Sequence, residues 1–163
     1  MEVRRHQLTV QTPSEPIALH ADAARLTQVL VNLLGNSAKY SPDGRHIELT
    51  ATVEQEPTVG GKTSPGMVKF TVTDDGHGIP ADKLPYVFDM FTQFASRPAT
   101  ADSGLGIGLP LVRYLVECHG GTVCVAGGNG RKGTTVSVML PVLERLQIIS
   151  PMQWQESMNE RTR

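Results

Sequence analysis

The spacing of apolar residues along the chain predicts two amphipathic helices. The first begins at Asp22, which can cap the opening turn, and continues with apolar residues at helical spacing. It stops before Pro42, which disfavours the helical conformation in the residue that precedes it. The second helix follows a run of glycines and continues to about His119, where two further glycines terminate it. We therefore expect one helix at 22–40 and a second that ends near His119.

Segments in which apolar and polar residues alternate predict strands with one buried face. Such segments lie at 46–53 and 67–73. Residues 3–10 and, more briefly, 17–20 also look like strands, and 122–126 with 134–140 is predicted to form a hairpin across the intervening glycine-rich residues. Strands and helices do not alternate regularly along the chain, and this order predicts an α+β fold. We expect a two-layer sandwich in which helices cover one face of a mixed, mostly antiparallel sheet. Residues 1–141 are expected to form this domain, and 142–163 a polar C-terminal linker or tail.

Composition narrows the class of protein. A length of 163 residues suits one domain, and a net charge of −1 gives no electrostatic preference for nucleic acid or membrane. Cys118 and Cys124 lack metal-type spacing and do not suggest a disulfide framework, so we expect a reduced, cytoplasmic setting. No apolar run approaches the length of a membrane span, and no signal peptide opens the chain. A strand pattern begins directly after Met1, as in a piece cut from a longer protein.

The first helix carries polar side chains along one edge of its apolar face. Asn32, Asn36 and Lys39 fall within a narrow arc at about 100° per residue. Amide oxygens can ligate a hard divalent cation, and an ammonium group suits phosphate. The same residues also fit the solvated polar edge of a core helix, and the helix alone leaves both interpretations open.

Three glycine-containing segments fail the familiar phosphate-binding motifs. A Walker loop ending at Lys62 is excluded because Glu56 occupies its first glycine position and Pro65 follows where a helix must begin. Residues 76–81 match the letters of the dinucleotide fingerprint, but two carboxylates precede them where pyrophosphate would bind, and no regular βαβ unit surrounds them. The cluster at 104–109 lacks the third small residue of that fingerprint.

The chemistry of these clusters suggests a different nucleotide site. Gly76 and Gly78 allow a tight turn with no Cβ to obstruct a flat ligand. Asp74 is an acceptor-only carboxylate at a strand end, suited to an exocyclic amine such as that of adenine and unsuited to phosphate. The glycines at 104–108 precede a helix, whose N-terminal N–H groups bind anions. An ordinary β-turn and a flexible loop joint remain alternatives for the two clusters.

Five sequence blocks in this order resemble the catalytic ATP-binding domain of sensor histidine kinases, in the GHKL superfamily. They are R-L-T-Q-V-L-V-N-L-L-G-N-S-A-K-Y-S (N box), D-D-G-H-G-I-P (G1 box), V-F-D-M-F (F box), G-L-G-I-G-L-P-L-V (G2 box) and the closing G-T-T-V-S-V-M-L-P. The resemblance covers roughly residues 1–141, and the five blocks at matching spacing are highly specific. It implies a four- or five-stranded sheet backed by helices, with ATP between the N-box helix and a lid.

The resemblance also implies roles for individual residues. Asn36 would ligate Mg²⁺ with support from Asn32 one turn earlier, and Lys39 would contact phosphate. Tyr40 would contact the ribose or the base edge, and Asp74 would accept a hydrogen bond from the adenine amine. The further implied residues are Gly76, Gly78 and Ile79 around the base, Thr134 bridged to Asp74 by water, Gly104, Leu105, Gly106, Ile107, Gly108 and Leu109 around the phosphates, and Phe88 and Phe91 at the lid base.

Three positions qualify the resemblance. Arg97 is the only basic residue in the lid, which makes it a candidate γ-phosphate contact or, alternatively, a solvated loop arginine. Ser37 replaces the alanine that is usual after the second asparagine, and Leu105 replaces a common threonine and removes one hydroxyl near phosphate. We expect both replacements to be tolerated.

The residue at position 32 favours phosphate transfer over hydrolysis. ATP hydrolases of the superfamily carry a water-activating glutamate there, and the amide of Asn32 lacks that basicity. None of the five histidines lies in a motif like H-E-L-R-x-P, so the acceptor is expected on a separate dimerisation domain, with a response regulator further downstream. We expect the isolated domain to be monomeric and to contact neither nucleic acid nor membrane. The alternative is a nucleotide-binding regulatory module without phosphotransfer.

Overall fold

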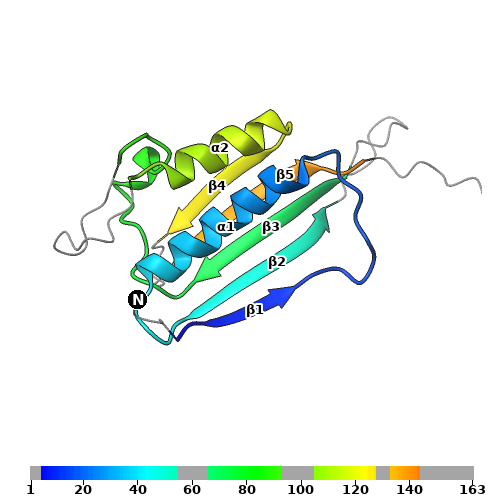
Figure 1. Cartoon of the computed structure of the whole chain (residues 1–163). Helices are drawn as coiled ribbons and strands as arrows, with labels where there is room; N and C mark the ends of the chain where they lie inside the picture. Colours follow the sequence, from blue (N-terminus) through cyan, green and yellow to red (C-terminus); the bar gives the residue numbers. More distant parts are fainter. Residues whose placement is uncertain (1–4, 55–65, 93–104, 128–132, 144–163) are drawn as a thin grey trace, which may run out of the picture.

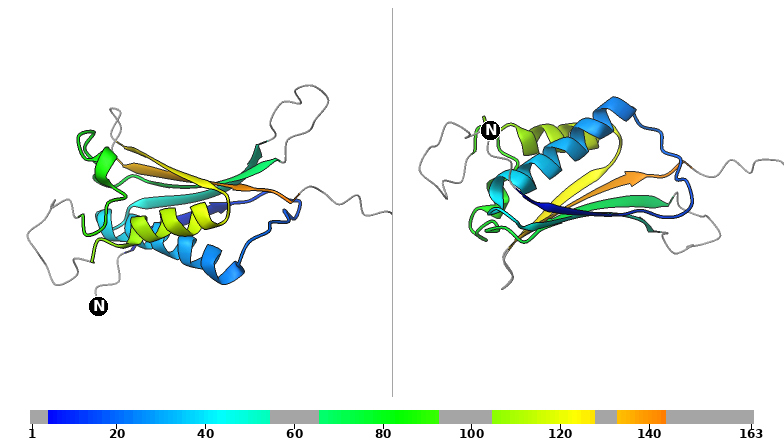
Figure 2. Two further views of the ribbon diagram at one scale, coloured as in Figure 1. Left: turned by 90° about the horizontal axis from the view of Figure 1, so that it is seen from above. Right: turned by 60° about the horizontal axis from the view of Figure 1, so that its bottom comes forward.

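The computed structural model describes residues 5–54, 66–92, 105–127 and 133–143. In these parts of the chain, one five-stranded sheet is covered on a single face by two helices, as Figure 1 and Figure 2 show. The strands are β1 (Gln7–Gln11), β2 (His46–Glu54), β3 (Met67–Asp74), β4 (Thr122–Gly127) and β5 (Thr134–Pro141). The helices are α1 (Ala23–Tyr40) and α2 (Gly108–Cys118), with a short 3₁₀ turn η1 (Leu84–Tyr86) between β3 and α2. No helix in the described part is long and apolar enough to cross a membrane.

The sheet has the order β1-β2-β3-β5-β4. β1 pairs with β2 in parallel, and the other neighbours pair antiparallel, which confirms the predicted mixed, mostly antiparallel α+β sandwich. The predicted strand at 17–20 is wrong, because Leu19 forms only an isolated bridge to Val142. This segment leaves the edge strand β1 to reach α1, and the prolines at 13 and 16 remove backbone donors that a longer ladder would need.

The bounds of α1 follow from local chemistry, as predicted. The Asp22 side chain caps the helix by accepting hydrogen bonds from the N–H groups of Ala24 and Arg25. Val29, Leu33 and Ser37 are buried at successive steps of four residues, so one stripe of the helix faces the sheet. The third member of this stripe is a hydroxyl side chain rather than an apolar one.

The core lies between the helices and the inner face of the sheet. Its fully buried members include Leu33 of α1, Val112 and Val116 of α2, and Val72 and Val138 of the central strands. Full burial of each such side chain contributes roughly 1.5–3 kcal/mol. The opposite face of β3 and β5 carries paired hydroxyl side chains, for example the Thr71 and Ser137 oxygens at 3.4 Å. The sheet therefore has an apolar inner face and a polar outer face, and a buried polar residue on the inner face is unusual.

Candidate functional site

Asp74 is the last inward-facing residue of β3, two positions beyond Val72. It is 8% exposed, and its carboxylate accepts hydrogen bonds from three separate parts of the fold. Oδ2 accepts from the Ser37 hydroxyl of α1 at 3.0 Å, and Oδ1 accepts from the N–H groups of Gly76 at 3.0 Å and Thr134 at 3.2 Å. A carboxylate has about four acceptor positions, so the donors among the described residues leave one for a further partner. The predicted pair of Asp74 and Thr134 is thus brought together, by a direct backbone hydrogen bond.

The glycine turn after β3 packs against the end of α1 and the start of β5. A Cβ on Gly76 would lie 2.6 Å from the Ser41 hydroxyl oxygen and 2.9 Å from Asp74 Oδ1, closer than a real side chain tolerates. Gly78 has a φ of +76°, and a Cβ there would lie 2.9 Å from the Gly133 carbonyl oxygen. A side chain at Gly78 would therefore meet backbone, and one at Gly76 would displace the Ser41 hydroxyl or the Asp74 carboxylate.

Two glycines outside the predicted set also border this region. Gly133 has a φ of +114°, and a Cβ there would overlap the Asp74 carbonyl oxygen. A Cβ on Gly127 would lie 3.1 Å from the carbonyl oxygen of Ile79, one of the predicted base contacts. Both glycines flank the connection from β4 to β5, where glycine is expected for turn formation alone, so their second role had no separate signal in the sequence.

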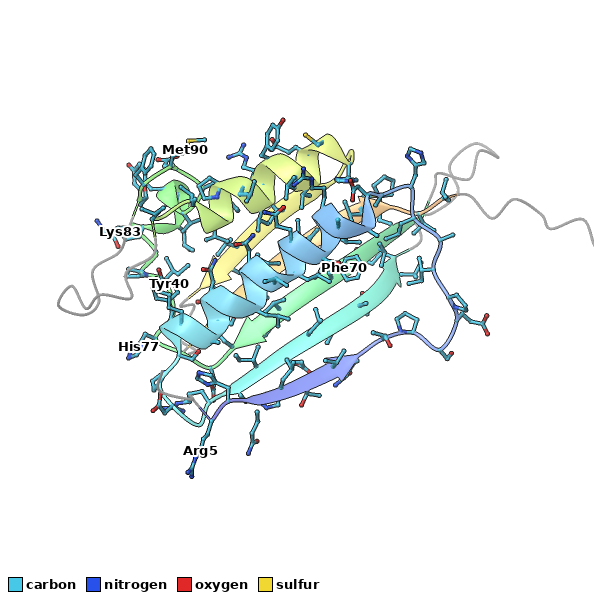
Figure 3. All side chains as sticks on the ribbon, viewed as in Figure 1. Arg5, Tyr40, Phe70, His77, Lys83 and Met90 are labelled. Carbon is cyan, nitrogen blue, oxygen red and sulfur yellow. The ribbon has the colours of Figure 1, made fainter. Side chains whose placement is uncertain are left out.

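The last residues of α1 lie beside the same turn. His77 Nδ1 donates a hydrogen bond to the Tyr40 carbonyl oxygen at 3.0 Å, which requires the proton on Nδ1. Figure 3 labels Tyr40 and His77 at this end of the sheet. The Tyr40 ring is exposed, and Lys39 Nζ lies 5.2 Å from its centroid, within cation–π range. The predicted Lys39 and Tyr40 therefore sit together next to the glycine turn.

The first residue of α2 lies against the two asparagines of α1. A Cβ on Gly108 would lie 3.5 Å from Asn36 Nδ2, 3.6 Å from Asn32 Oδ1 and 3.7 Å from Asn36 Oδ1. Asn32 Nδ2 donates to the Gln28 carbonyl oxygen at 2.9 Å, one turn back along α1. The N-cap residue of α2, Ile107, makes no side-chain capping hydrogen bond. The predicted amides thus meet a helix N-terminus that its own N-cap side chain leaves uncapped, an environment that suits an anion.

The segment before the predicted lid is joined to the segment after it by their backbones. The Phe91 N–H donates to the Gly106 carbonyl oxygen at 3.1 Å. Gly106 has a φ of +67°, and a Cβ there would lie 2.9 Å from the Thr92 carbonyl oxygen. Phe91 itself has a φ of +62°, a conformation that costs a non-glycine residue on the order of 1 kcal/mol or more. Both ends of the lid are therefore held together next to α2.

Phe88 and Phe91, both predicted at the lid base, contribute in different ways. The guanidinium carbon of Arg113 lies 5.6 Å from the centroid of the half-buried Phe88 ring. Glu117 accepts a hydrogen bond from Arg113 Nε at 2.8 Å, which raises the pKa of Arg113 and keeps it charged. The Phe91 side chain is 74% exposed, and among the described residues Phe91 is joined to Gly106 by its backbone N–H.

The remaining residues predicted to contact phosphate differ in how exposed their side chains are. Leu105 is 71% exposed and Ile107 43% exposed, whereas Leu109 packs against the core. Their side chains are apolar, so any contact with phosphate at these positions must come from backbone N–H groups. Arg97 and Gly104 lie outside the described residues.

Comparison with known proteins agrees with this geometry. Residues 21–144 match the family described as Histidine kinase-, DNA gyrase B-, and HSP90-like ATPase. The sensor histidine kinase TrcS of Mycobacterium tuberculosis is 35% identical over 140 residues, which make up 86% of this chain and 26% of TrcS. The chain thus spans about a quarter of the length of this relative.

Two solved structures are similar in fold and in sequence. The mycobacterial sensor histidine kinase MprB superposes with a TM-score of 0.68 at 28% identity, covering 84% of each chain. Full-length ShkA in complex with AMPPNP superposes with a TM-score of 0.64 at 28% identity, covering 84% of this chain and 26% of that one. The chain therefore belongs to the histidine kinase-, DNA gyrase B- and HSP90-like ATPase family, as an ATP-binding catalytic domain of the sensor histidine kinase type.

Proposed function

We propose that this domain binds Mg·ATP and transfers the γ-phosphate to a histidine on a separate dimerisation domain of a longer kinase. One observation carries the proposal. Consecutive residues of α1 reach both ends of the candidate site, since Asn36 faces Gly108 at the N-terminus of α2 and Ser37 bonds Asp74. A carboxylate suited to an amine and a helix N-terminus suited to phosphate therefore border the same turn of α1.

The base end is assigned to Asp74 and the glycine turn. The unused acceptor position of the Asp74 carboxylate would receive the adenine amine. Gly76 and Gly78 keep the adjacent wall free of side chains, and Ile79 supplies an apolar surface for the ring. We assign Tyr40 to the ribose or base edge because its ring is exposed and its carbonyl oxygen accepts a hydrogen bond from His77 of this turn.

The phosphate end is assigned to Asn36, Lys39 and the first turn of α2. Asn36 Oδ1 is a hard oxygen ligand beside that turn, and Mg²⁺ commonly takes one or two protein ligands together with phosphate oxygens. Within the described residues, no group of three or more His, Cys, Asp or Glu side chains could hold a metal alone. Bound Mg²⁺ would neutralise phosphate charge and orient the γ-phosphate. Backbone N–H groups at 105–109 and the lid residues Gly104 and Arg97 would contact the remaining phosphate oxygens.

Asn32 supports transfer to an external nucleophile. Its amide nitrogen is bonded to the Gln28 carbonyl oxygen, and an amide cannot accept a proton from water as a glutamate can. A neutral imidazole nitrogen needs no such base, because it is itself nucleophilic. We therefore propose the phosphoacceptor domain of the parent kinase as the direct partner and a response regulator as the downstream one. We further propose residues 1–141 as the domain, a monomer when isolated and cytoplasmic in the cell.

A phosphotransfer assay tests this proposal. The full chain is mixed with γ-labelled ATP, Mg²⁺ and the purified dimerisation domain of its parent kinase, and the product is treated with acid and with alkali. We expect label on the dimerisation domain that is lost in acid and retained in alkali, as phosphohistidine is. Omission of Mg²⁺ provides the control. Binding of ATP without transfer to a competent acceptor would instead support a regulatory nucleotide-binding module.

A further inference from the structure

The geometry points to Ser37 as a residue that positions Asp74 and thereby selects a 6-amino purine over a 6-oxo purine. This inference rests on the proposed nucleotide site. Ser37 is 5% exposed, lies in the stripe of α1 that faces the sheet, and donates its hydroxyl proton to Asp74 Oδ2 across 37 residues of sequence. The alanine expected at this position could not make that bond.

The hydrogen bonds of Asp74 determine where a ligand amine can bind. Both backbone donors, Gly76 N–H and Thr134 N–H, act on Oδ1 and occupy its two acceptor positions. The Ser37 hydroxyl occupies one position on Oδ2. The remaining position is therefore also on Oδ2, the oxygen that Ser37 holds. Without this hydroxyl, no described side chain would fix the second carboxylate oxygen.

The same bond makes the local surface acceptor-only. A serine hydroxyl has one proton, and that of Ser37 is used on Asp74, so its oxygen presents only lone pairs to any further partner. A 6-amino group can donate to such a surface. A 6-oxo group, as in guanine, is itself an acceptor. It would face the acceptor oxygens of Asp74 and Ser37 without a hydrogen bond, and these unpaired buried groups would weaken binding. Ser37 thus adds to selectivity without being a catalytic residue.

The test measures whether Ser37 acts through the 6-amino group. Affinities of the full chain and of Ser37→Ala are compared for ATP, GTP and purine riboside triphosphate, which lacks any 6-substituent. We expect Ser37→Ala to lower the affinity for ATP by about twofold to tenfold, the range for one neutral hydrogen bond. The affinity for purine riboside triphosphate should change by no more than about twofold. The ATP-to-GTP affinity ratio should fall accordingly.

Further variants separate the loss of the Ser37 hydroxyl from general effects of substitution. Ser137→Ala is the matched control, because its hydroxyl pairs with Thr71 on the opposite face of the sheet and should leave all three affinities unchanged. Ser37→Thr restores the hydroxyl and should recover the preference of the native chain for the 6-amino group. If Ser37→Ala does not fold, Ser37→Thr is compared with Ser37→Cys, whose thiol is a weaker donor. The ratio of ATP affinity to purine riboside triphosphate affinity should then be lower in Ser37→Cys than in Ser37→Thr.

The outcomes separate this inference from the proposed function. A native chain that binds none of the triphosphates overturns both. A native chain that binds ATP more tightly than purine riboside triphosphate, combined with equal losses for both in Ser37→Ala, leaves the nucleotide site standing and overturns the role of Ser37. Selective loss of ATP affinity in Ser37→Ala supports the inference.

Discussion

The backbone N–H of Asp22 donates a hydrogen bond to Nε2 of His119 at 3.1 Å, joining the start of α1 to the end of α2. On its other side the same ring donates from Nδ1 to the Leu115 carbonyl oxygen at 2.7 Å. The imidazole is therefore neutral with its proton on Nδ1, because Nε2 must accept. This contact fixes the two helices that carry the asparagines and the glycine-rich N-terminus of the site.

Replacing His119 should destabilise the fold. His119→Ala removes both hydrogen bonds, and we expect it to lower the free energy of unfolding by about 1–2 kcal/mol, since each bond contributes roughly 1 kcal/mol or less near the surface. The measurement is urea denaturation followed by far-UV circular dichroism. His20→Ala, at an exposed position, is the control and should leave the midpoint unchanged. An unaltered midpoint for His119→Ala would show that the bridge contributes nothing measurable.

Asp74→Asn should weaken ATP binding while the fold is retained. The asparagine keeps one oxygen for the backbone donors of β5 and the glycine turn, but it loses the charged acceptor for the adenine amine. We expect a loss of about 1–3 kcal/mol in binding free energy, measured by titration calorimetry. Asp75→Asn is the neighbouring control, because that carboxylate bonds the exposed His46 N–H instead. Equal ATP affinity in Asp74→Asn and the native chain would mean that Asp74 does not contact the base.

Asn36→Ala should act on the Mg²⁺-dependent part of binding. Loss of one amide ligand beside Gly108 is expected to weaken Mg·ATP binding by about tenfold, or about 1.4 kcal/mol, and to leave adenosine affinity unchanged. Both affinities are measured in Mg²⁺ and again in chelator. Val31→Ala, at a 63% exposed position of the same helix, serves as the control. If the loss is the same with chelator present, Asn36 is not the magnesium ligand.

Gly106→Ala should separate phosphate binding from base binding. Its φ of +67° and the close Thr92 carbonyl oxygen leave no room for a Cβ, so the hydrogen bond to Phe91 N–H should be lost. We expect ATP affinity to fall by about tenfold while adenosine binding changes little.

Gly44→Ala is a matched control for Gly106→Ala. Gly44 has a similar φ of +75°, but nothing lies within 4 Å of a Cβ built there. It carries the same backbone strain, of about 1 kcal/mol, without disturbing the lid base. If Gly44→Ala and Gly106→Ala lose ATP affinity to the same extent, the loss is due to general destabilisation of the fold.

A helix or strand could be predicted from the sequence where neighbouring residues determine it, and could not where it depends on a distant partner. Both ends of α1 were predicted because Asp22 and Pro42 act on their immediate neighbours. The strand at 17–20 was mispredicted because a short apolar run carries no information about a partner strand, and Leu19 forms only an isolated bridge to Val142. The individual roles of the predicted site residues stay predictions, although the structure brings Asp74 and Gly108 next to consecutive residues of α1.

Residue types and their local setting can be read from the chain without its fold: an amide edge on a helix, a carboxylate at a strand end and two glycine clusters. Each is recognisable because helix caps, turns and periodicity depend on near neighbours. The hydrogen bond of Ser37 to Asp74 and the close approach of Gly133 to the same residue could not be predicted without the folded chain. These contacts arise from the pairing of β3 with β5 and from the way α1 packs on the sheet, and both depend on residues far apart in the chain.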